Sequence, residues 1–263
     1  MIQTRLSDLK VAQEMADAAR AAILPFFRQS SLETTNKLAD GFDPVTQADR
    51  AAEQAMRDIL ARHRPDDGIL GEEFGTVAGT SGRTWVLDPI DGTRGFISGT
   101  PTWGVLIALS SQNGPVLGVI DQPYIKERFV GAAYVAEVTG PLGKTALRTR
   151  DTKVLGKAVL FTTFPEVGTP KDAAGFQAVS KHVQLTRYGM DCYAYALVAA
   201  GQADLVIEAG LNAYDIQAPI AVIEAAGGIV TDWQGRPAHN GGRALAAANA
   251  ELHAAALDIL RNY

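Results

Sequence analysis

The order of apolar segments along the chain changes near residue 140, and this change constrains the fold more than any other feature. Before it, strand candidates follow one another, at 69–70, 84–87, 103–110, 116–122 and 129–138. After it, strand and helix candidates alternate as far as residue 261. Consecutive strands are typical of an antiparallel sheet, and alternation is typical of an α/β arrangement. The sequence therefore predicts a mixed chain with both kinds of character.

The chain of 263 residues, 47% of them hydrophobic, is long enough for one large core. We expect residues 1–263 to form a single unit. Within it, residues 1–140 would combine helices at 6–28 and 47–64 with the antiparallel sheet, and Thr46 would be the N-cap of the second helix. Residues 141–263 would form the α/β part, after a boundary at 140–143.

Charge and composition exclude several classes of function. The formal net charge is −5 and no basic block occurs, so we expect no nucleic-acid partner. No apolar stretch reaches the length of a membrane span, so we expect no membrane partner. The only cysteine is Cys192, which rules out a disulfide within the chain and indicates a cytoplasmic location.

Acidic residues follow the predicted strands at three places. Glu72 and Glu73 come after the strand at 69–70, Asp88 and Asp91 come after the strand at 84–87, and Asp215 opens a predicted helix. Ligand sites of α/β sheets lie at the carboxyl ends of strands. The sequence thus predicts an acidic site built from distant segments.

The segment 88–93, Asp-Pro-Ile-Asp-Gly-Thr, carries the most chemical information. Asp88 would sit on a rigid strand end restricted by Pro89, and Asp91 could turn back toward it. Two such carboxylates repel unless a cation lies between them, and Mg²⁺ prefers oxygen ligands beside phosphates. The backbone N–H groups of Gly92 and Thr93 could approach an anion closely.

Each of these acids also has a simpler interpretation. Asp-Gly is a common turn pair, and Glu72 could be a solvated strand-end charge. Asp49 lies three residues after Thr46 and could complete a variant of the capping box. Asp215 could be an ordinary helix N-cap. The prediction of a metal site therefore rests on the set and not on any one residue.

The set resembles the inositol monophosphatase family of metal-dependent phosphatases. The resemblance runs over nearly the whole chain and is carried by four segments: Gly71-Glu72-Glu73, Trp85 to Thr93, Tyr214-Asp215 and Glu224 to Gly228. It implies a layered α-β-α-β-α sandwich of the inositol-monophosphatase/fructose-1,6-bisphosphatase type. It also implies a homodimer that hydrolyses small phosphate esters with two or three Mg²⁺ per active site.

The resemblance assigns roles by position. The expected metal ligands are Glu72, Asp88, the carbonyl of Ile90, Asp91 and Asp215. Phosphate would be bound at Asp91, Gly92 and Thr93. Thr93, Asp49 and Glu72 would be catalytic, because they would orient and activate the attacking water. Lys37 and Asp43 would belong to a mobile loop near the site.

Several segments resemble the histidinol-phosphatase branch of the family, among them 91–101, 104–109, 191–195 and 211–215. Asp191 and Glu208 match positions that line the pocket beside the phosphate. Two acids there would suit a cationic leaving group, which makes L-histidinol phosphate the expected substrate. Asp191 could instead cap the helix that follows it.

Three other interpretations of the chain compete with this one. Another branch of the family, acting on inositol phosphates or nucleotides, is the nearest. A metal-binding protein without activity is a second. A P-loop at Gly143-Lys144-Thr145 is a third, but Val138 occupies the place where that motif requires glycine.

Overall fold

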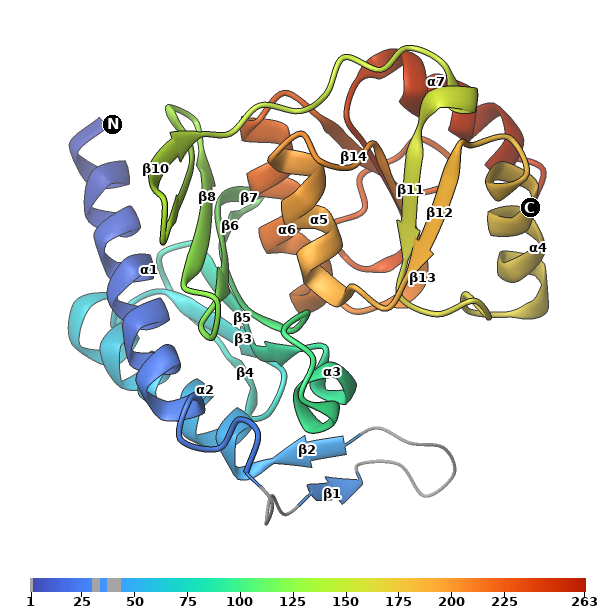
Figure 1. The fold of residues 1–263 in the computed structure, drawn as a ribbon. Coiled ribbons are helices and arrows are strands. Elements are labelled where there is room, and N and C mark those ends of the chain that lie inside the picture. Colours follow the sequence, from blue (N-terminus) through green and yellow to red (C-terminus); the bar gives the residue numbers. More distant parts are fainter. Residues whose placement is uncertain (1, 30–33, 37–43) are drawn as a thin grey trace.

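The computed structural model describes residues 2–29, 34–36 and 44–263, with seven α-helices in this part of the chain (Figure 1). The helices are α1 (Ile2–Ile23), α2 (Gln47–His63), α3 (Thr93–Ser98), α4 (Pro170–Ser180), α5 (Asp191–Ala199), α6 (Ala213–Ala225) and α7 (Ala250–Leu260), with a short 3₁₀ turn, η1 (Leu155–Lys157). None of these helices combines the length and the apolar character that crossing a membrane requires.

The first large sheet has eight strands in the order β10-β9-β8-β7-β6-β5-β3-β4. Its strands are β3 (Gly68–Gly71), β4 (Gly75–Val77), β5 (Thr84–Asp91), β6 (Gly104–Ser111), β7 (Gly114–Gln122), β8 (Glu127–Ala132), β9 (Val135–Gly140) and β10 (Gly143–Ala146). All pairs are antiparallel except β3 with β5. Two short strands, β1 (Thr34–Asn36) and β2 (Pro44–Thr46), pair separately.

The second large sheet has five strands in the order β12-β11-β13-β15-β14. They are β11 (Val159–Thr162), β12 (Leu185–Tyr188), β13 (Leu205–Leu211), β14 (Ile229–Thr231) and β15 (Gly242–Ala247). β11 pairs in parallel with both β12 and β13, as expected where helices connect the strands.

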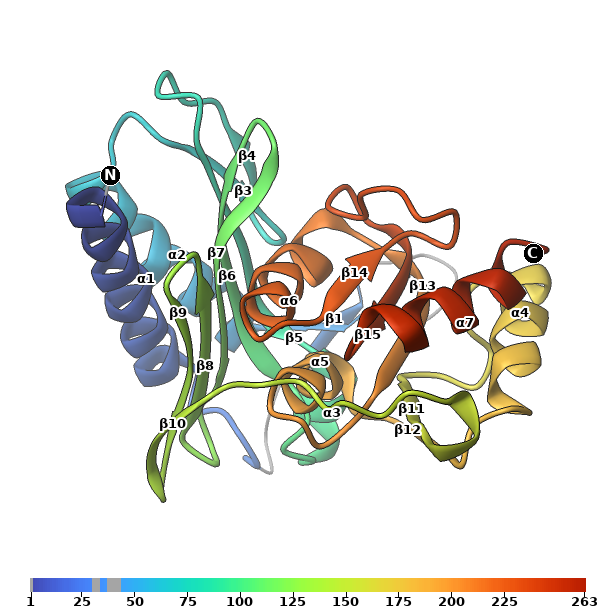
Figure 2. The same cartoon turned by 90° about the horizontal axis from the view of Figure 1, so that it is seen from above.

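The sheets and helices form five layers. α1 and α2 cover the outer face of the first sheet, α5 and α6 lie between the sheets, and α4 and α7 cover the outer face of the second (Figures 1 and 2). The middle layer is apolar nearly all round, with Ile216, Val222 and Ile223 of α6 fully buried. A helix of this kind must be covered on all sides. The predicted α-β-α-β-α sandwich is therefore confirmed.

Local sequence explains the boundaries that differ from the prediction. α1 ends at Ile23 and not at residue 28, because Pro25 has no backbone N–H with which to continue the helical hydrogen bonds. The strand expected at 129–138 is two strands, β8 and β9, joined by a tight turn. The turn at 140–143 joins β9 to β10, so the first sheet continues to Ala146. Division of the chain into subdomains 1–140 and 141–263 stays a prediction.

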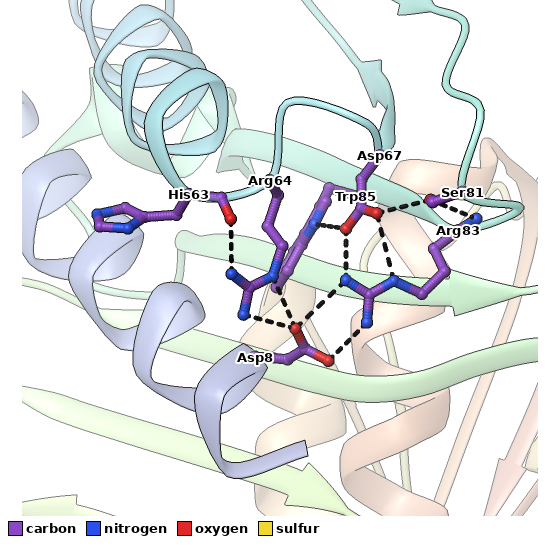
Figure 3. A network of polar contacts seen from close by, with 7 residues as sticks. All are labelled: Asp8, His63, Arg64, Asp67, Ser81, Arg83 and Trp85. Carbon is purple, nitrogen blue, oxygen red and sulfur yellow. Dashed lines mark hydrogen bonds and ion pairs between the residues drawn. The ribbon is translucent and has the colours of Figure 1, made fainter. Parts of the chain in front are cut away.

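A network of buried and half-buried charges ties α1 and α2 to the first sheet (Figure 3). Asp67 accepts hydrogen bonds from Arg83 (2.7 Å), Ser81 (2.6 Å) and the indole N–H of Trp85 (2.9 Å). Arg83 also donates to Asp8 of α1 at 2.7 Å. Burial alone would raise the pKa of Asp67, but the hydrogen bonds from Arg83, Ser81 and Trp85 outweigh it, and the pKa lies below its usual range.

We predict that Asp67→Asn destabilises the fold by about 2–3 kcal/mol at neutral pH, because it weakens charge-assisted hydrogen bonds in a buried place. Since the folded-state pKa of Asp67 is lowered, its contribution is present above pH 3.8, the usual value, and is lost as pH falls through the folded-state pKa. Urea unfolding at pH 7 and at lower pH measures this. Asp66→Asn, at the exposed neighbouring residue, is the control. If Asp67→Asn destabilised the protein as much at low pH as at pH 7, the prediction would be wrong.

Candidate active site

A cavity of about 330 Å³ lies where the two large sheets and the middle helices meet. Its wall comes from the turn after β3, the end of β5, the start of α3, the ends of β11 and β13, and the starts of α5 and α6. Strand ends and helix starts from both halves of the chain therefore converge on one space. Six of the lining residues are acidic and one, Arg94, is basic.

Three aspartates form the centre of this site. Asp88, Asp91 and Asp215 each offer a carboxylate oxygen, and these oxygens all lie within 4.8 Å of one another. Asp88 and Asp91 are the last part of β5, where a register shift against β6 inserts one extra residue between them. Such a bulge bends the strand and redirects side chains. Asp215 comes from the first turn of α6, far along the chain.

Burial raises the pKa of Asp88 well above its usual range, and the charges of neighbouring carboxylates, first that of Glu72, raise it further. Burial likewise raises the pKa of Asp91, although the backbone N–H of Cys192 donates to its Oδ2 at 2.6 Å. Burial raises the pKa of Asp215 to about 7 against the lowering effect of the Asn212 N–H, which donates to it at 2.6 Å. The three carboxylates thus repel one another in a setting short of positive charge.

Glu72 lines the same cavity, beside Asp88. The parallel pairing of β3 with β5 explains this, because it places the carboxyl ends of both strands at one edge of the sheet. The carbonyl of Ile90 accepts the hydroxyl of Thr93 at 3.2 Å, and both residues line the cavity. Thus Glu72, Asp88, Ile90, Asp91 and Asp215, the expected metal ligands, are brought together.

Gly92 links this cluster to α3. Its φ of 82° is left-handed, which glycine adopts freely. A Cβ at this position would also lie 2.6 Å from Cγ of Asp191, so a side chain has no room. Thr93 begins α3 directly after it. The side chain that excludes a Cβ here is that of Asp191, and the sequence prediction that the Gly92 backbone binds an anion stays a prediction.

Asp49 is buried in the first turn of α2 and completes a capping box with Thr46, as the spacing suggested. Its Oδ2 accepts the Thr46 N–H at 2.8 Å and the Thr46 hydroxyl at 2.6 Å, while its buried Oδ1 has no hydrogen-bond partner. Burial raises its pKa to about 7. Among the described residues, the cavity wall does not include Asp49. Its carboxyl is close enough to Glu72 and Glu73 for their charges to act on it.

Asp191 lines the cavity and has a φ of 45°, an uncommon backbone conformation that aspartate tolerates better than most residues. This conformation directs the following N–H, that of Cys192, to Asp91. The hydroxyl of Thr102 donates to Asp191 at 3.0 Å. Burial raises the pKa of Asp191, against lowering effects of Thr102 and the nearby Arg94.

Glu208 of β13 is buried in the cavity wall and is held by three donors. The backbone N–H and hydroxyl of Thr163 donate to Oε1 at 3.0 and 2.6 Å, and the hydroxyl of Tyr195 donates to Oε2 at 3.0 Å. Burial raises its pKa, although these hydrogen bonds oppose the shift. Both Asp191 and Glu208 therefore lie in the wall of the cavity that holds the aspartate cluster.

Several residues of the cavity wall were not assigned a role from the sequence. Arg94 lies with its guanidinium 4.8 Å from the ring centre of Phe164, and both residues line the cavity. Thr163, Tyr195 and Thr102 matter because they hold the two acids described above. Arg94 follows the Asp-Gly-Thr segment directly, which was a usable signal. The others carry no sequence signal, because their positions depend on how the sheets pack. Lys37 and Asp43 lie outside the described residues.

The donor set fits a hard divalent cation. One buried and two half-buried carboxylates with raised pKa values and oxygens this close need a cation, protons or both. Carboxylate oxygens and a nearby carbonyl are the ligands that Mg²⁺ prefers. The cavity thus combines a candidate cation site with the backbone of Gly92, a residue that has no side chain of its own.

Comparisons with known proteins agree with this geometry. The sequence profile of the inositol monophosphatase family matches residues 6–263. The chloroplastic bifunctional phosphatase IMPL2 of Arabidopsis thaliana is 42% identical over 86% of this chain, which spans 64% of that protein's length. A histidinol-phosphatase of Streptomyces coelicolor is 36% identical over 94% of each chain. An inositol-1-monophosphatase of Caulobacter vibrioides is 34% identical over 93% of this chain and 96% of its own.

Solved structures share the fold. An inositol monophosphatase from Zymomonas mobilis superposes with a TM-score of 0.85 at 42% identity, covering 97% of each chain. The inositol monophosphatase of Anabaena (Nostoc) gives a TM-score of 0.81 at 29% identity, covering 98% of this chain and 97% of that one.

We predict that Asp215→Asn stabilises the metal-free protein at pH 8 by about 1–3 kcal/mol. The pKa of Asp215 is raised from 3.8 to about 7, so the stability contributed by its protonated form is complete below 3.8 and lost as pH rises through 7. Asparagine stays neutral and avoids this loss. Thermal melts in EDTA at pH 4.5 and 8 measure the difference.

Asp258→Asn, at an exposed acid of α7, is the control for this measurement and should change neither melt. The gain from Asp215→Asn should grow with pH. A gain that is equal at both pH values, or a loss at pH 8, would contradict the prediction.

Proposed function

Because this chain belongs to the inositol monophosphatase family, we propose that it is a Mg²⁺-dependent phosphatase that hydrolyses L-histidinol phosphate to L-histidinol and phosphate, a step of histidine biosynthesis. The family and the relatives above are phosphoric monoester hydrolases, and the family is metal-dependent. The identity of the metal and the substrate are our proposals. The observation that carries the substrate proposal is the pair of acids in the cavity wall, half-buried Asp191 and buried Glu208.

Mg²⁺ would be held by Glu72, Asp88, the carbonyl of Ile90, Asp91 and Asp215. When bound, it would supply the positive charge that offsets the phosphoryl oxygens and makes the attacking water more acidic. The chain's own residues have separate tasks. The N–H groups of Gly92 and Thr93 would bind and orient the phosphate beside Asp91.

Thr93, Asp49 and Glu72 would orient and activate the attacking water. The Thr93 hydroxyl donates a hydrogen bond to the Ile90 carbonyl, so its oxygen is left to accept a hydrogen bond from the attacking water and orient it. Asp49 has a buried, unpartnered Oδ1 and a pKa raised to about 7, which suits a group that takes up a proton near neutral pH.

The charge of the cavity favours a cationic leaving group. Three Mg²⁺ would balance the four metal-binding carboxylates and a doubly charged phosphate, and two would leave some negative charge over. In either case Asp191 and Glu208 add further negative charge. Arg94 offsets part of the Asp191 charge. The amine and imidazole of histidinol would balance the remainder, and opposite charges attract strongly where water is scarce.

An inositol phosphate is the second candidate. The Caulobacter relative bears the name inositol-1-monophosphatase and is 34% identical, as close as relatives named histidinol-phosphatase at 34–36%. The relatives therefore do not separate the two substrates. A homodimeric assembly and a cytoplasmic location complete the proposal. The family resemblance supports the former and the lone Cys192 the latter.

We predict that kcat/KM with Mg²⁺ is at least about 10-fold higher for histidinol phosphate than for inositol 1-phosphate, since binding groups matched to the amine discriminate against a neutral polyol. Phosphate release measures both. Asp88→Asn should reduce activity on either ester at least ~100-fold by removing a cation ligand, and Asp258→Asn should not. Equal or better turnover of the inositol ester would reject the substrate proposal.

We further predict that Asp191→Asn lowers kcat/KM for histidinol phosphate about 10-fold, or ~1.4 kcal/mol, and leaves the inositol ester within twofold. Asparagine has the same shape and tolerates a positive φ, so the substitution isolates the charge. The measurement is the ratio of the two specificity constants. A loss of the same size on both substrates would show that Asp191 supports the cavity and does not select the leaving group.

A further inference from the structure

Glu53 is a completely buried carboxylate that the proposed chemistry does not use. It lies on α2, one helical turn after Asp49, and its exposed fraction is 0%. A buried carboxylate is strongly unfavourable unless partners compensate for the lost water. The partners of Glu53 therefore indicate what the residue does.

Two of those partners are backbone N–H groups of the turn that follows β3. The N–H of Glu73 donates to Oε2 of Glu53 at 2.6 Å, and that of Phe74 donates to Oε1 at 3.2 Å. Arg57, on the next turn of α2, donates to Oε1 at 2.8 Å and to the carbonyl of Gly75 at 2.5 Å. One side chain thus fastens the turn to the helix, and its arginine partner fastens the end of the turn.

Gly71 shows how closely the turn depends on this carboxylate. A Cβ at Gly71 would lie 2.0 Å from Oε1 and 2.5 Å from Cδ of Glu53, closer than atoms can approach. Gly71 does not have a positive φ, so its backbone conformation does not require glycine. The space that a side chain would need is occupied by Glu53. The glycine of Gly71-Glu72-Glu73 is therefore explained by a residue of another element.

The turn is tied on its other side to β5. The N–H of Glu72 donates to the carbonyl of Leu87 at 3.1 Å, one residue before Asp88. Glu72 is thus held between the strand that carries Asp88 and the helix that carries Asp49. We propose that Glu53 is a positioning residue, which sets Glu72 at the cation site relative to those two carboxylates. This inference rests on the proposed function, in which Glu72 is a Mg²⁺ ligand.

Glu53→Gln tests this proposal because it keeps the size of the side chain. The amide nitrogen is a donor, so one end of the side chain would face an N–H of the turn or Arg57 without accepting from it. We expect Mg²⁺ affinity, measured by isothermal titration calorimetry, to fall about 10–100-fold, as for other groups that orient metal ligands. Activity should recover in part as Mg²⁺ is raised, since the ligand itself remains.

A role in stability alone is tested by a matched control. Asp121 of β7 is also 0% exposed and is paired with Arg20 at 2.7 Å and Arg128 at 2.6 Å. It fixes α1 to the sheet and lies outside the described cavity wall. Asp121→Asn should lower the melting temperature and leave Mg²⁺ affinity within twofold. Equal Mg²⁺ affinity of Glu53→Gln and the unaltered protein would overturn the proposal, and so would an equal loss in both variants.

Gly71→Ala provides a second test if Glu53→Gln does not fold. Its methyl group would push the Glu53 carboxylate out of its position without removing its negative charge. We expect the same weaker Mg²⁺ binding. Unchanged affinity in Gly71→Ala would overturn the proposal. Absence of Mg²⁺ binding by the unaltered protein would instead refute the proposed function, together with the inference that rests on it.

Discussion

The mutual repulsion of the clustered carboxylates in the cavity is the interaction on which this structure depends. Asp88, Asp91 and Asp215 present oxygens within 4.8 Å of one another, and burial raises the pKa of each. A chain that only had to fold would gain from replacing them with neutral groups. The fold instead keeps them together, and Arg94 is the one basic residue in the described wall. Such an arrangement becomes favourable when cations bind, so the unfavourable charge is what creates affinity for the metal.

The layered architecture makes this concentration of charge possible. β3 and β5 run in parallel, so Glu72 and Asp88 leave the sheet at the same edge, and the bulge in β5 turns Asp91 back toward them. The middle layer then brings in Asp215, because α6 packs against the first sheet while its first turn faces the cavity. Asp88 and Asp91 lie on a strand and Asp215 on a helix, and the turn that carries Glu72 is tied to β5 by a backbone hydrogen bond. The packing of the buried apolar layers on both sides of the cluster therefore offsets the repulsion between its carboxylates.

The sequence was informative wherever a residue's role is local. Thr46 and Asp49 cap α2 as their spacing predicted, and the segment 88–93 supplies two of the three clustered aspartates, because chain geometry over a few residues decides both. The sequence was much less informative about contacts between distant elements. The sequence around Glu208 does not predict that Thr163 and Tyr195 donate hydrogen bonds to it. The sequence around Gly71 does not predict that the Glu53 carboxylate packs against it. Those contacts depend on how α2, α5 and the two sheets pack, which no local pattern encodes.

The same distinction explains why substrate choice is harder to infer than reaction type. The groups proposed to bind the phosphate lie in short, recognisable segments, which histidinol and inositol phosphatases can share because the phosphoryl group is the same in both substrates. In the proposed function the leaving group would meet Asp191, and the structure places a second requirement on this residue. Its positive φ directs the Cys192 N–H to Asp91, so this residue supports the cation site through its backbone while its carboxylate faces the cavity. A substitution that changed both features would confuse the two roles.

The backbone role restricts position 191 to residues that tolerate a left-handed conformation, and among these only aspartate brings a negative charge. That coincidence of backbone demand and side-chain charge is the physical reason to regard Asp191 as the residue that selects a cationic ester.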